Sequence, residues 1–208
     1  MFYEPRAGDH GLPKNPFNSL VIPRPIGWIT SLSADGTVNL APYSFFNAVS
    51  YRPPTVMFSA GHGIVDDDRL KDSQRNIEET GEFVHNVTTW ETREAMNATS
   101  AHLPKEVDEL AEAGLTPLPA KLVKPPRVKE SPIHFECKLI QVVRLPHDKP
   151  EDAYTVIFGE VIGIHIDDDL IGGDGLIDVA KLCPIARLGY QDYAKVVAET
   201  IFTLERPD

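Results

Sequence analysis

Residues 24–80 contain several strand-like stretches in which small polar side chains are interspersed with aromatic ones. The polar members are Thr30, Ser31, Ser44, Asn47, Ser50 and Ser59. The aromatic members are Trp28, Tyr43, Phe45, Phe46 and Phe58. An apolar surface that carries a few hydrogen-bonding groups suits a flat heterocycle, which needs both stacking and edge contacts. Serine and asparagine at strand ends are also ordinary turn residues, so both interpretations stay open.

A second cluster lies at the predicted start of a helix, in the run Leu70-Lys71-Asp72-Ser73. A lysine, a hydroxyl and the amides of a helix N-terminus together favour an anion, most naturally a phosphate. Asp72 or Ser73 could instead serve only as the helix cap. If both clusters serve one ligand, that ligand is a phosphorylated cofactor.

The histidines and acidic residues do not indicate a metal site. His134-Phe135-Glu136 has the His-x-Glu order of zinc deaminases, but the Pro-Cys-x-x-Cys partner is missing. We therefore expect His134 and Glu136 on the solvent-facing side of an alternating strand. The run from Asp167 to Asp178 matches part of a calcium loop, yet Ile171 stands at its fifth position, so we expect a solvated acidic turn.

The sequence also gives little support for covalent catalysis or for a nucleotide-binding loop. Cys137 alternates with Phe135 and Leu139, which predicts a buried structural thiol. Gly61-His62-Gly63 and Gly172–Gly175 do not complete a phosphate-binding motif. No side chain is assigned a catalytic role.

Charge and composition narrow the class of protein. The 208 residues include 20 basic and 31 acidic ones, a formal net charge of −11, which disfavours nucleic-acid and membrane-surface roles. The N-terminus lacks a basic start followed by an apolar run, and no apolar stretch approaches the length of a membrane span. Two cysteines are compatible with a reducing compartment. We expect a cytoplasmic globular protein.

The first half of the chain predicts strands and then helices. Strands are expected at 26–32 and 38–41, joined by a two-residue turn at Asp35-Gly36, with Pro42 breaking the second strand or placing it at an edge. Another strand is expected at 55–59 and a loop at 61–68. A helix over about 70–80 would end at a left-handed Gly81, before a strand at 83–87.

Two further helices and a return to strands follow. Thr88 and Glu91 form a capping-box pattern for a helix reaching about Ser100, and a short helix over about 105–113 would end at Gly114. Strands resume at 133–139 and 154–164, and a short helix or turn with a final strand is expected within 187–203. Between them, residues 116–132 form a loop with Pro117, Pro119, Pro125, Pro126 and Pro132.

This order predicts one domain over residues 1–208, with a helical and proline-rich insertion at about 88–132. Strands without regular βαβ alternation favour a mostly β or α+β class, an antiparallel barrel or sandwich with helical insertions. The insertion could shape a substrate site or cover the barrel, and the pattern favours neither.

Several blocks of the chain together resemble the flavin reductase-like, flavoredoxin-type family. The resemblance runs from about residue 20 to 195. Its blocks are 23–26, Thr30-Ser31 with Asp35-Gly36, 39–47, Pro53-Pro54 with 57–59, Lys71-Asp72-Ser73 with Asn76-Ile77, 80–84 with Asn86, and 184–189 with Tyr193.

The resemblance implies a six-stranded antiparallel Greek-key split barrel that binds FMN, in a homodimer with FMN near the interface. Transferred by position, Thr30 and Ser31 would border the isoalloxazine or the ribityl chain. Lys71 and Ser73 would hold the phosphate, where the family more often has threonine at the position of Ser73. The further flavin contacts are Ser44, Phe45, Asn47, Ala48 and Ser59.

The resemblance also implies an oxidoreductase that passes electrons from NAD(P)H through FMN to a flavin, a metal chelate or a small organic acceptor. Two alternatives stay open: an FMN electron-transfer protein, and a non-catalytic protein that binds flavin or another small molecule. Asp66, Asp67 and Asp68 lie close to the expected phosphate and would weaken its binding unless they point outward.

Overall fold

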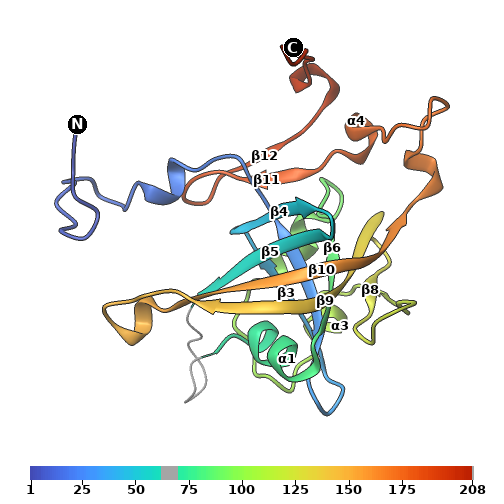
Figure 1. Ribbon diagram of the computed structural model, residues 1–208, viewed down its shortest axis with the longest axis horizontal. Helices are drawn as coiled ribbons and strands as arrows, with labels where there is room; N and C mark the ends of the chain where they lie inside the picture. Colours follow the sequence, from blue (N-terminus) through green and yellow to red (C-terminus); the bar gives the residue numbers. More distant parts are fainter. Residues whose placement is uncertain (62–69, 208) are drawn as a thin grey trace.

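The computed structural model describes residues 1–61 and 70–207, whose centre is a large antiparallel sheet (Figure 1). The sheet has seven strands in the order β3-β2-β6-β9-β10-β5-β4. Their bounds are β2 Gly27–Leu32, β3 Val38–Tyr43, β4 Phe46–Tyr51, β5 Pro54–Gly61, β6 Glu82–Asn86, β9 Ile133–Arg144 and β10 Tyr154–Ile166. All its neighbouring strands pair antiparallel. The mostly β, antiparallel prediction is confirmed, and the six strands expected are close to the seven found.

Smaller elements surround this sheet. A three-stranded sheet has the order β1-β11-β12, and β7 pairs with β8. These strands are β1 Arg24–Pro25, β7 Pro117–Leu118, β8 Arg127–Val128, β11 Ile185–Arg187 and β12 Tyr193–Lys195. The α-helices are α1 Asp72–Thr80, α2 Arg93–Ala98, α3 Glu109–Glu112 and α4 Val179–Leu182. Short 3-10 turns are η1 Phe17–Ser19, η2 Pro150–Asp152, η3 Asp168–Leu170 and η4 Ala198–Thr200.

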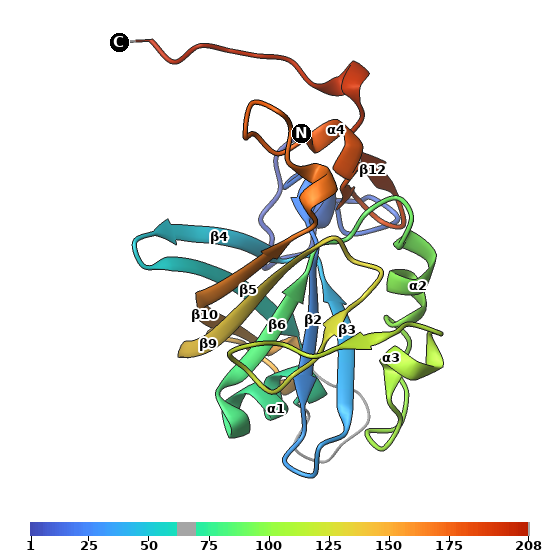
Figure 2. The same ribbon diagram turned by 90° about the vertical axis from the view of Figure 1, so that its right-hand side faces the viewer.

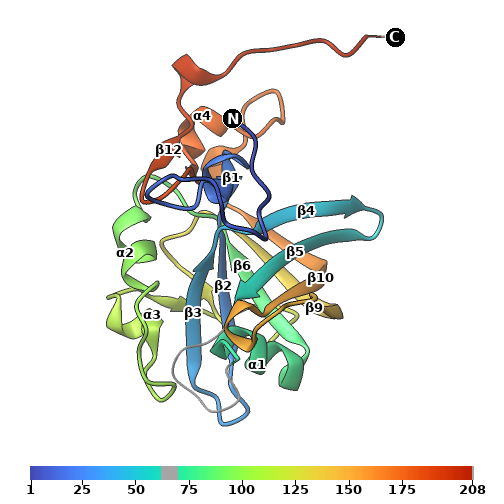
Figure 3. The same cartoon turned by 90° about the vertical axis from the view of Figure 1, so that its left-hand side faces the viewer.

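The side views show how these elements are distributed. Helices α2 and α3 lie beside β3, while the β4–β5 hairpin projects from the opposite side of the sheet (Figure 2). The N-terminal segment lies near β12 and α4, and the last residues extend away from the body of the protein (Figure 3). The β1-β11-β12 sheet thus sits at one end of the large sheet, with the turn after β2 at the other.

Strand β2 is buried on both faces, and its two polar residues, Thr30 and Ser31, are as inaccessible as its apolar ones. Trp28 packs with Leu40 in one core cluster, whereas the adjacent Ile29 packs with Phe58 and Phe83 in the other. Successive side chains of a strand point to opposite faces, so each cluster occupies one side of the sheet. A strand covered on both sides needs no polar face.

The predicted insertion at 88–132 covers one side of the sheet. Met96 of α2, Leu110 of α3 and Val128 of β8 pack in the cluster that contains Trp28. The indole Nε1 of Trp28 also donates a hydrogen bond of 2.9 Å to Oγ1 of Thr99. The segment therefore supplies the apolar cover that the Trp28 face of β2 requires.

The first hairpin forms as expected, but its turn differs from the prediction. Leu32 pairs with Val38, so residues 33–37 form the connection in place of a two-residue turn. Gly36 has a φ of +93°, whereas Asp35 is not in the left-handed region. The Asp35 carboxylate instead accepts hydrogen bonds from Ser33 and Thr37, and such a network stabilises a longer loop. Pro42 lies in β3, which is an edge strand as predicted.

The helices lie where the sequence predicts them, but α2 and α3 are shorter than expected. Gly81 ends α1 with a φ of +74°, as predicted. The helix expected from Thr88 begins only at Arg93, and the Thr88–Glu91 capping box is wrong because Thr89 and Thr92 hydrogen-bond to each other across the turn. The helix expected over 105–113 is restricted to 109–112, preceded by Asp108, whose carboxylate accepts from the amide of Ala111. Strand β4 was not predicted.

The expectation that His134 and Glu136 face solvent is wrong. Both side chains are buried, with Glu136 fully inaccessible. The Glu136 carboxylate accepts from the amides of Lys121 and Leu122 at 2.8 and 2.5 Å and contacts Nε2 of His165 at 2.5 Å. These hydrogen bonds replace water, which is the condition for burying a carboxylate. The proline-rich segment 116–132 thus folds over this face of β9.

Two other local predictions, the buried Cys137 thiol and the exposed acidic turn, are confirmed. Cys137 is fully buried, and burial raises the pKa of its thiol. Asp167, Asp168 and Asp169 are exposed in an acidic turn. Among the described residues there is no group of three side chains able to hold a metal, and none of the helices there has the length and apolar character needed to cross a membrane.

Two of the sequence blocks that carry the family resemblance meet at Arg24. Its guanidinium donates to the carbonyl oxygens of Val21 and Leu188 at 2.8 and 2.9 Å and also contacts the Asn18 carbonyl. Strand β1 pairs with β11, which places the first block beside the last. The buried Arg24 therefore joins the N-terminal segment to the C-terminal hairpin.

Candidate functional site

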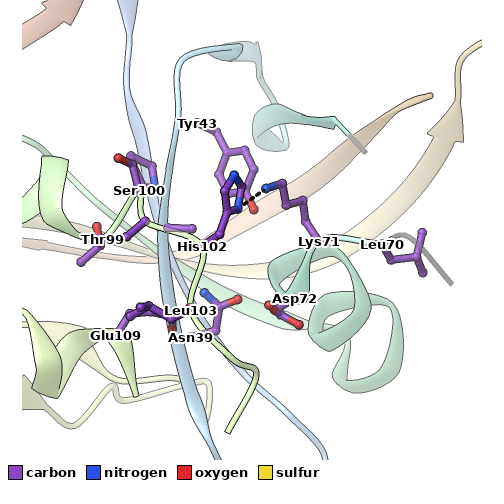
Figure 4. A pocket seen from close by; sticks show the side chains of 13 residues that line it. Asn39, Tyr43, Leu70, Lys71, Asp72, Thr99, Ser100, His102, Leu103 and Glu109 are labelled. Carbon is purple, nitrogen blue, oxygen red and sulfur yellow. Dashed lines mark hydrogen bonds between the residues drawn. The ribbon is translucent and has the colours of Figure 1, made fainter. Parts of the chain in front are cut away.

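A cavity of about 120 Å³ borders the start of α1 (Figure 4). Strand β3 supplies one wall, the Leu70–Asp72 segment a second, and the chain between α2 and α3 the third. Its lining side chains include Asn39, Tyr43, Lys71, Asp72, Thr99, Ser100, His102, Leu103 and Glu109. A cavity of this size accommodates a phosphate-sized group, because pockets for whole cofactors are several times larger.

Lys71 is the cationic side chain of this cavity. It occupies the N-cap position of α1, and its Nζ lies 3.3 Å from Nδ1 of His102 (Figure 4). Burial lowers the pKa of Lys71, and the neighbouring Asp72 partly opposes that shift. A half-buried ammonium at a helix N-terminus adds its charge to the positive end of the helix dipole, which favours a bound anion.

Ser73 lies behind the cavity wall. It is fully buried, and its hydroxyl donates to Oδ1 of Asn39 at 3.3 Å. Tyr43 is also buried, and desolvation raises the pKa of its phenol while the hydroxyl of Ser73 opposes that rise. Asn39, Tyr43 and Ser73 therefore fix the first turn of α1 against β3, which sets the position of Lys71.

Two carboxylates adjoin the cavity. Asp72 forms an ion pair of 2.7 Å with Arg75, which offsets its charge. Glu109 is buried and accepts from the amide of Leu40 at 3.1 Å, and burial raises its pKa to about 7. Because Asp72 is paired and Glu109 is partly protonated near neutral pH, neither opposes an anion beside Lys71 with a full, free charge. Asp66, Asp67 and Asp68 lie outside the described residues.

Thr30 and Ser31 are close to this site but face into the protein. Oγ1 of Thr30 accepts from Nδ2 of Asn86 at 2.7 Å, and Oγ of Ser31 accepts from Nδ2 of Asn76 at 3.2 Å. Both side chains are fully buried. Ser31 pairs with Asn39 across β2 and β3, so it belongs to the polar layer beneath α1.

The remaining predicted residues gather at the start of the β4–β5 hairpin. The Phe45 carbonyl accepts from the amide of Ser59 at 2.8 Å, and the Phe45 ring lies 6.0 Å from that of Tyr154. Asn47 and Ala48 are exposed on β4, where Oδ1 of Asn47 accepts from the amide of Ala48. Ser44 precedes this group directly, next to Tyr43 of the cavity.

The predicted residues therefore form two groups joined by Tyr43. Lys71, Ser73 and Ser31 belong to the cavity and its supporting layer, and Ser44, Phe45, Asn47, Ala48 and Ser59 belong to the hairpin. Thr30 belongs to neither group, because its hydroxyl is bonded to Asn86. The tyrosine lines the cavity, and its ring centroid is 4.7 Å from that of Phe58, the strand residue before Ser59. Sequence reasoning missed His102 and Glu109, since their contacts with β3 and α1 span long distances in the chain.

The chain matches a model of a known protein family. Residues 18–186 match the family model described as the flavin reductase like domain. The matched range includes the cavity, the β4–β5 hairpin and the segment that covers the Trp28 face.

Solved structures with the same fold extend this result. Nitrilotriacetate monooxygenase component B from Bacillus cereus is 32% identical, with a TM-score of 0.86 and 98% of each chain covered. The 2-nitrobenzoate 2-nitroreductase of Pseudomonas fluorescens is 27% identical, with a TM-score of 0.78 and coverage of 92% of this chain and 91% of that one. A protein with a split barrel domain from Shewanella frigidimarina is 24% identical, with a TM-score of 0.75 and coverage of 92% and 89%. The split barrel prediction is confirmed.

Proposed function

The chain belongs to the flavin reductase-like domain family, and from this premise we propose that it is an FMN-dependent NAD(P)H oxidoreductase. It would pass electrons from NAD(P)H through FMN to a flavin, a metal chelate or a small organic acceptor. The observation that carries the proposal is the half-buried Lys71, at the N-cap of α1 and directed at a phosphate-sized cavity. The similarity to a monooxygenase component and to a nitroreductase supports an oxidoreductase role.

The residues present fit a flavin phosphate. Lys71 offers a cation, and as N-cap it makes no side-chain capping bond to the first turn within the described chain, which leaves the helix amides available to a ligand. Ser73 would contribute its backbone amide, since its hydroxyl is engaged with Asn39. His102 would hold the Lys71 ammonium toward the cavity.

The flavin ring would lie along the β4–β5 hairpin. Ser44, Phe45, Asn47, Ala48 and Ser59 would supply backbone, hydroxyl and ring contacts there. Thr30 and Ser31 would border the ligand from β2 while their hydroxyls stay bonded to Asn86 and Asn76. Because the cavity of about 120 Å³ holds only part of the cofactor, the rest would lie over the open hairpin surface.

Bound FMN would supply the two-electron redox chemistry of the reaction. The chain's own contribution is binding and orientation. Lys71 would neutralise the phosphate, and Tyr43 and Phe45 would limit the positions open to the ring. No side chain needs to carry a proton in this scheme.

We also propose a cytoplasmic homodimer with FMN near the interface. Apolar side chains are exposed on the β4–β5 hairpin and just before β1, where Tyr51 is 95% and Leu20 67% exposed. Exposed apolar surface of this kind favours contact with a partner, and a second copy of the chain is the one the family resemblance implies. Sedimentation velocity at micromolar concentration would give the mass of a dimer, and a monomer would contradict this.

An anaerobic visible absorption titration tests the function. The purified protein is reconstituted with FMN, freed of excess cofactor and titrated separately with NADH and NADPH. Retained flavin that bleaches quickly with either nucleotide supports the reductase and identifies its donor. Flavin that is retained but bleaches only with a chemical reductant would favour an electron-transfer protein. Failure to retain flavin would favour a non-catalytic binding protein.

A further inference from the structure

A second and larger cavity, of about 830 Å³, lies between the chain around α2 and the β11–β12 hairpin. Met96 and Ile185, both buried, line it with apolar surface. The amide of Trp90 donates to the carbonyl of Cys183 at 3.0 Å, which ties the two walls together. The volume is within the range of pockets that take a whole ligand.

Aromatic rings and cations alternate around this cavity. The Trp90 ring has the Arg93 guanidinium 4.0 Å and the Lys195 ammonium 4.5 Å from its centroid. The Arg187 guanidinium lies 4.5 Å from the centroid of the Tyr193 ring. Packing against the rings fixes the orientation of these cations. A site that presents fixed cations beside aromatic rings suits a ligand that has both a planar ring and negative charge.

The charge of this cavity is opposite to that of the protein. Arg93, Arg187 and Lys195 line it with Glu94 as the one carboxylate among the lining residues, in a chain of net charge −11. Glu94 contacts Arg93 at 2.9 Å and is itself exposed. A multiply charged anion is repelled by an acidic surface in general, so a local cluster of three cations directs it here.

The second cavity adjoins the first. Ser100 lines both of them, at the start of the segment that follows α2. A ligand in the second cavity would therefore be a near neighbour of one held by Lys71.

We propose that this second cavity binds a nucleoside diphosphate. Resting on the proposed function, the ligand is the adenosine diphosphate half of NAD(P)H. Trp90 and Tyr193 would stack on the adenine ring, and Arg93, Arg187 and Lys195 would contact the diphosphate. Asn97 and Gln191, which also line the cavity, provide polar groups for the ribose and the ring edge.

Tryptophan fluorescence reports binding directly. The chain has two tryptophans, of which Trp28 is fully buried and Trp90 is 41% exposed. Titration of the FMN-loaded protein with ADP is expected to change the emission of Trp90 in a saturable way. The Trp90→Phe variant keeps a ring in place but loses this signal, which shows that the change arises at the cavity.

Lys195→Ala tests the charge, with Lys14→Ala as the matched control. Lys14 also lies against an aromatic ring, 5.4 Å from the centroid of Tyr190, but does not line the cavity. Isothermal titration calorimetry with ADP is expected to give a Kd raised roughly tenfold in Lys195→Ala, the scale of one lost charged hydrogen bond, and unchanged in Lys14→Ala. The KM for NAD(P)H should rise in parallel in Lys195→Ala, while kcat and FMN retention stay unchanged.

ADP binding and flavin reduction are measured separately, so the failure of the nucleotide site can be distinguished from the failure of the proposed function. If the wild type does not bind ADP at millimolar concentration, or if Lys195→Ala and Lys14→Ala bind it equally, the cavity is not a nucleoside diphosphate site, whether or not NAD(P)H is oxidised. If ADP binds in a Lys195-dependent way but neither nucleotide reduces the flavin, the site stands and the oxidoreductase function fails.

Discussion

Nζ of Lys71 and Nδ1 of His102 lie 3.3 Å apart across the cavity at the start of α1. The lysine comes from the segment that leads into a helix, and the histidine from the covering segment between α2 and α3. Their contact explains how a long, flexible side chain is held over the cavity. It also makes the covering segment part of the candidate site, so the segment has both a packing and a positioning role.

Replacing Lys71 by alanine should weaken FMN binding without unfolding the protein. A hydrogen bond to a charged group contributes about 1.5–3 kcal/mol, which corresponds to a Kd raised roughly ten- to a hundredfold. Fluorescence titration of the apoprotein with FMN measures the change. Lys105→Ala, in the exposed chain before α3, is a control of equal charge.

Riboflavin makes this test specific for the phosphate. It shares the ring and ribityl chain with FMN but has no phosphate, so Lys71→Ala should leave its affinity within twofold of the wild type. An equal loss for FMN and riboflavin would mean that Lys71 supports the fold of the site and does not contact the phosphate.

Glu109 should make the protein less stable as the pH rises from about 4.5 to about 7. Burial raises the pKa of Glu109 from 4.5 to about 7 in the folded state. Between these values the unfolded chain releases the proton first, so the unfolded state is favoured as the pH rises, by up to about 1.4 kcal/mol per unit of pKa difference. Below pH 4.5 both states hold the proton and the effect vanishes.

Glu109→Gln isolates this contribution. The amide oxygen can still accept from the Leu40 amide, and no charge is buried. We expect the variant to exceed the wild type in free energy of unfolding by about 1–3 kcal/mol at pH 8 and to equal it at pH 4. Urea denaturation at the two pH values measures both, and a constant difference would assign the effect to packing.

The sequence predicts those parts of the fold that depend on near neighbours. Gly81 marks the end of α1 because a positive φ is needed there and glycine adopts it without strain. The alternating pattern of β10 predicts a strand because every second side chain in most of its length is buried. Lys71 was found for the same reason, since an N-terminal lysine and the helix that follows it are adjacent in the chain.

The predictions that failed depend on contacts between distant segments. Glu136 looks exposed in an alternating strand, and only the fold brings the Lys121 and Leu122 amides and His165 to its carboxylate. Strand β4 was missed because five of its six residues are exposed, so its sequence has no apolar period. His102 lies in a loop, and nothing near it in the sequence indicates that it reaches Lys71.

Gly159 of β10 should not tolerate a side chain. A Cβ at this position would lie 2.3 Å from Cζ of Phe83 and 3.3 Å from Cβ of Cys137. Phe83 is fully buried and cannot move aside, so Gly159→Ala should lower the free energy of unfolding by about 1–3 kcal/mol. Gly173→Ala is the matched control, because nothing lies within 4 Å of its added Cβ. Thermal denaturation compares the two, and equal melting temperatures would show that the core around Phe83 relaxes.

Asn86 should contribute more to stability than the Thr30 hydroxyl that it contacts. Its Nδ2 donates to the Trp28 carbonyl and to Oγ1 of Thr30, at 3.1 and 2.7 Å, and its Oδ1 accepts from the Val128 amide at 2.9 Å. Asn86→Ala removes hydrogen bonds to the Trp28 carbonyl, the Thr30 hydroxyl and the Val128 amide, at about 1–3 kcal/mol for each buried group left without a partner. Thr30→Val removes one acceptor, and we expect a loss of about 1–2 kcal/mol.

The hydrogen bond between Asn86 and Thr30 also allows a test of whether Thr30 borders the flavin. Because its hydroxyl already accepts from Asn86, Thr30 can border the cofactor only through its backbone and its methyl group. Thr30→Val, which keeps the shape of the side chain, should therefore leave the Kd for FMN within twofold of the wild type while chemical denaturation shows the lower stability. A Kd raised tenfold at unchanged stability would mean that the hydroxyl turns from Asn86 to the cofactor when FMN binds.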